Sequence, residues 1–319
     1  MTHLQDRLVV GVDVGGTKIL AGLVTADGRV LATERRATPR DERQVVTEMV
    51  DVIRSLSAPH DGPLPVGCGF PALVTREGVT RYGPNIAVRE LPLRDALVEQ
   101  LGTDEVVIEN DASAAAWAEF AVGAGRAVRA DMALFTLGTG VGGGLIIGGR
   151  LHRGANGFAG ELGHMVLVVD GEPGPSGVDG ELEAYSSGSA VHRMGRDAHA
   201  AGRFAGTSLD GPLPPTGEMI TQAGRDGVPA AVEILATVGR YLGIGAAAVV
   251  NALDPEMIVV GGGAGAAGEL VLGPARAAMQ ASVLGAAHRP VVPMVPTQLG
   301  PEAGMVGAAL LALDAAGER

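Results

Sequence analysis

An acid stands at the edge of a glycine-rich turn near the start of the chain. Asp13 lies in an apolar run and precedes Gly15, Gly16, Thr17 and Lys18. Backbone amides in such a turn can cradle phosphate oxygens, whereas a carboxylate repels them. A carboxylate does attract the Mg²⁺ that accompanies a nucleotide. A tight hairpin with an incidental acid is the other interpretation, because the pattern is neither G-x-G-x-x-G nor a Walker loop.

Two more glycine turns follow apolar runs, at 138–144 and at 261–263. The first could be a bulged hairpin or a phosphate cradle, and the second is a further place where a ligand could approach the backbone. A triphosphate bound between two lobes would explain all of these turns, and Asp13 would then bind the Mg²⁺ that accompanies it.

A polar triplet, Glu109, Asn110 and Asp111, ends an apolar run and begins an alanine-rich one. Asn110 or Asp111 could simply cap the helix that starts there, which is a frequent role for these residues. The carboxyl end of a strand is also where α/β folds bind ligands. There, a carboxylate can orient an acceptor hydroxyl and take its proton.

A second polar set could recognise the hydroxyls of a sugar. Carboxylates, amides and a neutral imidazole together offer donors and acceptors for adjacent hydroxyl groups. A histidine near a strand can equally be a structural residue. The members of this set are Asn85, Asn110, Glu161, His164 and Glu183.

Composition limits the class of protein. The chain has 319 residues, 46% of them hydrophobic, and a formal net charge of -12, which argues against nucleic-acid and anionic-membrane partners. The start lacks a signal-peptide pattern and no apolar run reaches about 18 residues without Gly or charge, so we expect a cytoplasmic protein without a membrane segment. Cys68 is the only cysteine, which excludes an intrachain disulfide and a thiolate metal cage.

The elements that must position these residues follow a repeated pattern. Alternating apolar runs flank Asp27-Gly28, a strong hairpin signal, and helical spacing follows over Asp41–Leu56. Three antiparallel strands, a helix and then parallel strands are typical of a ribonuclease-H-like layer. The strand and turn pattern recurs over Met132–Gly154, as if the unit were duplicated. Two such lobes facing each other would place both glycine turns on one cleft.

At this point the motifs resemble those of a known family. GVDVGGTK, PNI, ENDASAAAW, LGTGVGGGLIIGGRLHRGANGFAGELGH, ELEAYSSGSA and NALDPEMIVVGGG stand in the order and at the spacings of the ROK family (repressors, open reading frames, kinases), and are similar to its bacterial glucokinases. The likeness runs from about Leu8 to Ala312.

The resemblance implies an α/β, actin-like ATPase (ribonuclease-H-like) fold with two lobes of mixed sheets flanked by helices and a cleft between them. The expected lobes are residues 1–120 and 121–303, with a final helix at about 304–319 packing back on the first lobe. A homodimer or dimer of dimers is expected. The implied reaction is the phosphorylation of a hexose, glucose first, at its 6-hydroxyl by ATP with Mg²⁺.

By position, the resemblance also assigns roles. Asp111 matches the catalytic base, and Asn85, Asn110, Glu161, His164 and Glu183 match the sugar-binding set. The first phosphate motif corresponds to Asp13, Gly15, Gly16, Thr17 and Lys18. The second phosphate and adenosine motifs correspond to Thr139, Gly140 and Gly262.

The chain departs from the family pattern in two places. The family's three zinc-binding cysteines are replaced by Gly174, Ser176 and Glu181, so we expect no structural zinc, and hydrogen bonds or an ion pair of Glu181 must order the loop. Ala72 and Thr75 also stand where Gly and Asp are usual, which bears on the identity of the sugar.

Several alternatives stay open. The acceptor could be N-acetylmannosamine or another hexose, and the donor could be polyphosphate, although the acidic chain favours ATP. A non-catalytic sugar or nucleotide sensor is a further possibility. A sugar-responsive repressor would need a helix-turn-helix ahead of the first strand, where about seven residues stand.

Overall fold

The computed structural model describes residues 7–60, 62–83, 86, 88–265 and 267–317. By internal contacts the chain forms two compact units. The first comprises Met1–Ala130, Gly144–Gly160 and Gln298–Arg319, and the second comprises Asp131–Gly143 and Glu161–Thr297. The first unit thus takes in 144–160, which lies within the predicted second lobe. The division into lobes 1–120 and 121–303 stays a prediction.

The first unit contains a five-stranded sheet in the order β3-β2-β1-β4-β8. The antiparallel β1–β2–β3 meander is joined by the parallel strands β4 and β8, so the ribonuclease-H-like pattern is confirmed. Gly28 has φ +80 in the predicted hairpin turn, a conformation that favours glycine. The strands are β1 (Leu8–Val14), β2 (Lys18–Thr25), β3 (Val30–Ala37), β4 (Val66–Phe70) and β8 (Val106–Asn110).

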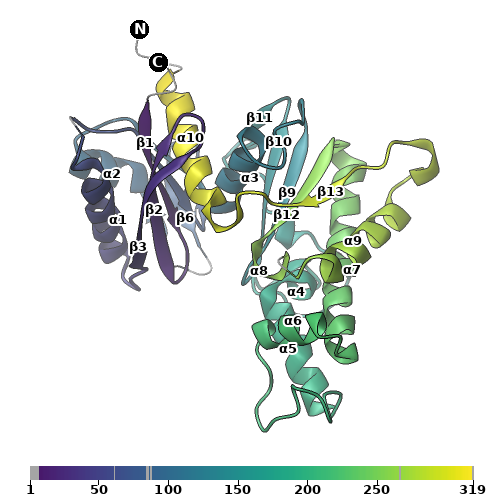
Figure 1. Cartoon of the computed structure of the whole chain (residues 1–319). Coiled ribbons are helices and arrows are strands. Elements are labelled where there is room, and N and C mark those ends of the chain that lie inside the picture. The colour runs from purple at the N-terminus through teal and green to yellow at the C-terminus, as the bar shows by residue number, and fades with distance from the viewer. Residues whose placement is uncertain (1–6, 61, 84–85, 87, 266, 318–319) are drawn as a thin grey trace. The chain divides into compact units, whose positions relative to one another are not determined.

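Helices cover this sheet. The predicted helix over Asp41–Leu56 is confirmed as α1, and the Asp41 side chain caps it by accepting from the amides of Arg43 and Gln44. The final helix, α10, packs on β1, β4 and α3, as Figure 1 shows by its yellow ribbon beside β1. The helices are α1 (Glu42–Ser57), α2 (Leu93–Leu101), α3 (Asp111–Ala121) and α10 (Ala303–Gly317).

Glycines allow α10 to approach the sheet closely. A Cβ at Gly67 of β4 would lie 1.8 Å from the carbonyl oxygen of Ala308, and a Cβ at Gly11 of β1 would lie 2.2 Å from that of Met305. Real side chains cannot occupy such positions, so these glycines set the distance between helix and sheet. A small three-stranded sheet completes the unit: β5 (Leu73–Val74), β6 (Thr80–Tyr82) and β7 (Arg89–Leu91).

A second five-stranded sheet has the order β11-β10-β9-β12-β13, and the division between the units falls within β10. Its order repeats that of the first sheet: a β9–β10–β11 run in sequence, then β12 parallel to β9 and β13 parallel to β12. The predicted duplication is therefore confirmed. The strands are β9 (Met132–Leu137), β10 (Val141–Ile147), β11 (Arg150–Leu151), β12 (Met257–Gly261) and β13 (Met294–Pro296).

The remaining helices belong to the second unit. The 25-residue α7 is, by length and composition, a candidate membrane span, but 56% of its apolar window is buried and α9, α6, α5 and α4 pack against it. It is thus the core helix of this unit. The helices are α4 (Glu183–Ser186), α5 (Gly188–Ala200), α6 (Gly217–Arg225), α7 (Pro229–Leu253), α8 (Gly262–Gly265) and α9 (Glu269–Ser282), and the short 3-10 helices of the chain are η2 (Leu162–His164), η3 (Ala286–His288) and η4 (Gly300–Glu302).

Candidate functional site

The β1–β2 turn is fixed by backbone contacts that leave its tip exposed. The amide of Gly15 donates to the carbonyl of Lys18 at 2.8 Å, and Thr38 Oγ1 donates to the carbonyl of Gly15 at 2.6 Å. Gly16, Thr17 and Lys18 are exposed. The turn can therefore present amides and an ammonium group to an anion without rearranging its own hydrogen bonds.

Asp13 and Asp111 are brought together by β1, β4 and β8. Asp13 pairs in register with Gly69 of β4, and a Cβ at Gly69 would lie 3.5 Å from Asp13 Oδ1 and 3.3 Å from the Cα of Asp111. Glycine at this position leaves the space between the two acids open. The pKa of Asp13 is raised to about 7, chiefly by burial and then by the charge of Asp111, while Lys18 opposes the shift.

Asp111 is the first residue of α3, directly after β8. Its Oδ1 accepts from the amide of Ala112 at 2.9 Å, and Oδ2 has no hydrogen-bond partner within the described ranges. Burial raises the pKa of Asp111, and the Ala112 amide opposes that shift. One carboxylate oxygen is thus held by the helix while the other can accept a proton.

Asn110 takes the capping role that its position also suggested. Its Oδ1 accepts from the amide of Ser113 at 3.0 Å and its Nδ2 donates to the carbonyl of Ala72 at 3.3 Å. The side chain is therefore oriented by the protein. One N–H of Nδ2 is left for a ligand, because an amide nitrogen carries two.

Glu109, which precedes Asn110, is almost wholly buried and forms an ion pair that the sequence analysis missed. Arg153 Nε donates to Glu109 Oε2 at 2.6 Å, and the amide of Asn110 donates to Oε1 at 3.0 Å. Burial raises the pKa of Glu109, and Arg153 opposes the shift. No local sequence signal links Glu109 to Arg153, because they lie 44 residues apart.

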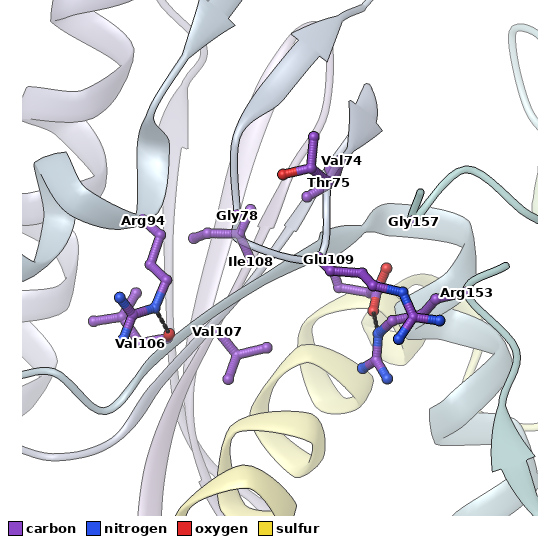
Figure 2. Close-up of a pocket in the computed structure, with 11 residues that line it drawn as sticks. Val74, Thr75, Gly78, Arg94, Val106, Val107, Ile108, Glu109, Arg153 and Gly157 are labelled. Atoms are coloured by element: carbon purple, nitrogen blue, oxygen red, sulfur yellow. Dashed lines mark hydrogen bonds and ion pairs between the residues drawn. The ribbon is translucent and has the colours of Figure 1, made fainter. Parts of the chain in front are cut away.

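The pair borders a pocket of about 300 Å³ within the first unit. Figure 2 shows Glu109 and Arg153 at one end of it and Arg94 beside Val106 at the other. The lining contains none of the predicted site residues. It consists of Val74, Thr75, Arg76, Gly78, Arg94, Val106, Val107, Ile108, Glu109, Arg153 and Gly157.

In the second unit, Glu183 lies against the glycine turn that follows β9. Its Oε2 accepts from the amide of Val141 at 2.6 Å, and a Cβ at Gly140 would lie 2.2 Å from the same oxygen. Ser189 Oγ donates to the carbonyl of Thr139 at 2.8 Å. A predicted sugar ligand, Glu183, is therefore adjacent to two predicted phosphate ligands.

Gly262 lies at the same edge of the second sheet. The parallel strands β9 and β12 pair up to Thr136 and Gly261, so the turns that follow them emerge together. Gly262 has φ +83, and its Cβ would lie 2.5 Å from the carbonyl carbon of Leu137. Only glycine fits this left-handed close approach.

His164 is surrounded by carboxylates. Its Nδ1 is 2.8 Å from Glu181 Oε2 and its Nε2 is 3.7 Å from Glu161 Oε2. Burial alone would lower the pKa of His164, but the Glu181 hydrogen bond, with the charges of Glu181, Glu161 and Glu183, raises it overall. The predicted residues His164, Glu161 and Glu183 are therefore close together, and Glu181 adjoins them.

The structure thus groups the predicted residues by unit. Asp13, Asn110 and Asp111 lie at the carboxyl edge of the first sheet, and Thr139, Gly140 and Gly262 lie at that of the second. Asn85 lies outside the described residues. The ligand assigned to each residue stays a prediction.

The residues present suit a magnesium ion better than a zinc ion. Asp13 is a partly buried carboxylate whose pKa is raised, so a divalent cation would stabilise its charged form, and the hard oxygen donor suits Mg²⁺. The expected zinc positions offer no thiolate, since Gly174 and Ser176 carry none and Cys68 lies in β4. The described part of the chain contains no group of three or more His, Cys, Asp or Glu that could hold a metal ion. The residues present do not fit a thiolate zinc site.

Comparison with known proteins places these motifs in context. The model of the ROK family matches residues 9–315. A glucokinase of Streptomyces coelicolor is 40% identical, with 96% of this chain and 98% of that protein covered. A ROK family glucokinase from Streptomyces griseus, solved with glucose and AMPPNP, superposes with a TM-score of 0.87 at 40% identity, over 96% of this chain and 99% of that one. A ROK hexokinase from Thermus thermophilus superposes with a TM-score of 0.80 at 33% identity, over 98% of this chain and 100% of that one.

Proposed function

Because the chain belongs to the ROK family, we propose that it transfers the terminal phosphoryl group of ATP to the 6-hydroxyl of glucose, forming glucose 6-phosphate and ADP. The observation that carries the proposal is the carboxylate of Asp111, fixed through Oδ1 at the carboxyl end of β8 with Oδ2 left to accept a proton. The similarity to a glucokinase solved with glucose and a nucleotide analogue supports both substrates. The fold is the actin-like ATPase fold expected from the motifs.

In the proposed reaction Asp111 acts as the general base. Oδ2 accepts the proton of the sugar hydroxyl while that oxygen forms a bond to the γ-phosphorus and the bond from phosphorus to the β,γ-bridging oxygen breaks. Because burial raises the pKa of Asp111, the carboxylate is a stronger base than an exposed aspartate. The Ala112 amide holds Oδ1 and thereby fixes the direction of Oδ2.

The remaining predicted residues take the binding roles. For the sugar hydroxyls we propose Asn85, Asn110, Glu161, His164 and Glu183. For the nucleotide phosphates and adenosine we propose Gly15, Gly16, Thr17, Lys18, Thr139, Gly140 and Gly262. Asp13 would hold Mg²⁺, which when bound neutralises charge on the phosphate oxygens.

The test is ADP release with Mg·ATP against a panel of glucose, mannose, N-acetylmannosamine, N-acetylglucosamine, fructose and allose. We expect the highest kcat/KM for glucose. A higher kcat/KM for N-acetylmannosamine or another hexose would support kinase activity but would reject glucose as the preferred acceptor. Sugar binding without turnover on any sugar would show that the protein is a sensor and not an enzyme. Turnover with polyphosphate but not with ATP would show that polyphosphate is the phosphoryl donor.

Two further parts of the proposal concern the setting of the enzyme. We propose that it acts in the cytoplasm, where ATP and free hexose meet. We also propose that it assembles as a homodimer or a dimer of dimers, which light scattering coupled to size exclusion measures directly. A monomer at micromolar concentration would reject the second proposal.

A further inference from the structure

Glu181 is a wholly buried acid with few partners. Its relative exposure is 0%, and within the described ranges its one ion-pairing partner is His164. A buried carboxylate is costly unless hydrogen bonds and charge compensate it. Neighbouring groups must therefore offset the cost of burying the Glu181 carboxylate by hydrogen bonds and opposite charge.

The compensating groups come from two segments. Glu181 Oε2 meets His164 Nδ1 at 2.8 Å and accepts from Ser176 Oγ at 2.6 Å, while Oε1 accepts from the amide of Ser176 at 3.2 Å. Gly174 completes the enclosure, because a Cβ there would lie 2.2 Å from Oε1. One carboxylate thus connects the loop at Gly174–Ser176 to the 3-10 helix that carries His164.

The rest of the loop is held by backbone hydrogen bonds that converge on the same place. The amides of Leu167 and Val168 donate to the carbonyl of Gly180, and the amide of Leu182 donates to that of Met165. These contacts bring the end of the loop next to His164. By contrast, within the part of the chain that the structure describes, the Ser176 side chain donates to Glu181 and accepts only from the nearby Val178 amide. Glu181 is therefore the link between the tip of the loop and the histidine.

The contact also fixes the protonation pattern of the histidine ring. The pKa of Glu181 is lowered by Ser176 and His164 despite the opposing effect of burial, so its carboxylate is ionised and can only accept. His164 Nδ1 must therefore carry a proton. In the neutral ring, Nε2 is then the acceptor, and it is this atom that points toward Glu161.

We propose that Glu181 is a positioning residue that, without a metal ion, orders the loop Gly174–Glu181 and holds His164 in its Nδ1–H form with Nε2 available to the substrate. Of the three positions where a thiolate site would need cysteines, Ser176 and Glu181 make hydrogen bonds of this cluster, and Gly174 leaves room for the Glu181 carboxylate. The substrate at Nε2 rests on the proposed function, whereas the order of the loop and the form of the ring do not.

The first experiment needs no activity. Limited proteolysis and ¹⁵N NMR of the histidine rings are measured on sugar-free protein for wild type, Glu181→Ala, Ser176→Ala and Asp179→Asn. Asp179 is exposed and two residues away, so its variant removes the same charge without touching the cluster. We expect Glu181→Ala to increase cleavage within 174–180 about tenfold or more and to shift His164 from the Nδ1–H form. Ser176→Ala should increase cleavage less, and Asp179→Asn should match wild type.

Two results would overturn the proposal. One is a Glu181→Ala protein whose loop cleavage and His164 ring signals equal those of wild type. The other is a wild-type protein that contains stoichiometric zinc and loses loop protection on treatment with 1,10-phenanthroline. If circular dichroism shows that Glu181→Ala does not fold, the test is loop cleavage of Ser176→Ala. Unchanged loop cleavage in that variant rejects the proposal.

A second experiment connects the cluster to catalysis. Glu181→Ala should raise the KM for the accepted sugar about tenfold while changing the KM for ATP little, because a misplaced imidazole weakens sugar contacts rather than phosphate contacts. An unchanged sugar KM would reject the role of His164 positioning in sugar binding. If wild type shows no turnover on any sugar, the kinase proposal fails. The proteolysis and NMR results still test whether Glu181 orders the loop and sets the form of the His164 ring.

Discussion

Arg153 Nε and Glu109 Oε2 are 2.6 Å apart, and the Glu109 side chain is only 4% exposed while that of Arg153 is 34% exposed. Glu109 also accepts from the amide of Asn110, the residue before the proposed base. The ion pair thus adjoins the junction of β8 and α3. Its partner Arg153 follows β11, so a segment distant in sequence compensates the charge of Glu109.

Removing Arg153 should destabilise the protein. Arg153→Gln leaves the Glu109 carboxylate buried without its cation, and we expect a loss of about 2–3 kcal/mol in the free energy of unfolding by urea denaturation. Glu109→Gln in the Arg153→Gln background should recover part of that loss. The matched control is Arg81→Gln, because Arg81 and Glu90 are also 2.6 Å apart but 51% and 61% exposed. That variant should lose less than about 1 kcal/mol. Equal losses in the two single variants would mean that burial does not decide the value of the pair.

Replacing the proposed base should stop chemistry and spare nucleotide binding. Asp111→Asn keeps the acceptor for the Ala112 amide but cannot take a proton, so we expect kcat to fall by about 10²–10⁴. Isothermal titration with an ATP analogue should give a dissociation constant within about threefold of wild type. Asp95→Asn, at a side chain that is 79% exposed, is the control and should retain full turnover. Near-normal turnover of Asp111→Asn would reject the assignment of the base.

Asp13 should make the ligand-free protein less stable as the pH rises. The pKa of Asp13 is raised from the ordinary 3.8 to about 7, chiefly by burial and then by the charge of Asp111, so between these values its carboxyl binds more protons in the folded state than in the unfolded state. The contribution of Asp13 to the free energy of unfolding therefore falls from about pH 4 to about pH 7 and is level above that. Relative to wild type, Asp13→Asn should gain about 1–3 kcal/mol at pH 8 and little at pH 4. Denaturation curves measured without nucleotide and Mg²⁺ give this difference, and a gain that does not change with pH would contradict it.

The approach of α10 to the sheet should not tolerate a side chain at Gly67. Gly67→Ala places a methyl group 1.8 Å from the Ala308 carbonyl oxygen, so the helix must move, and we expect a loss of about 3 kcal/mol or more in thermal or urea unfolding. Gly211→Ala is the control because its Cβ meets nothing within 4 Å. That variant should change stability by less than about 0.5 kcal/mol. A stable Gly67→Ala protein would show that α10 can shift on the sheet at low cost.

The sequence was sufficient for the elements and their order. Asp41 with the helical spacing after it, Asp27-Gly28 between alternating runs, and the recurrence of the strand pattern after Met132 are local signals, and each predicted what the structure contains. These features depend on residues a few positions apart, whose backbone preferences and side-chain periods act whatever the rest of the chain does. The motifs also identified the family.

The partners of the site residues were decided by the tertiary structure. Asn110 could be a cap or a ligand from its sequence position, and the fold shows that its Oδ1 caps α3. Sequence alone left open how the loop without cysteines is ordered, and the fold places Ser176 and His164 on the carboxylate of Glu181. The pairing of Arg153 with Glu109 had no sequence signal at all. Such contacts join residues far apart along the chain, so they exist only once packing has buried the charges and made a partner necessary.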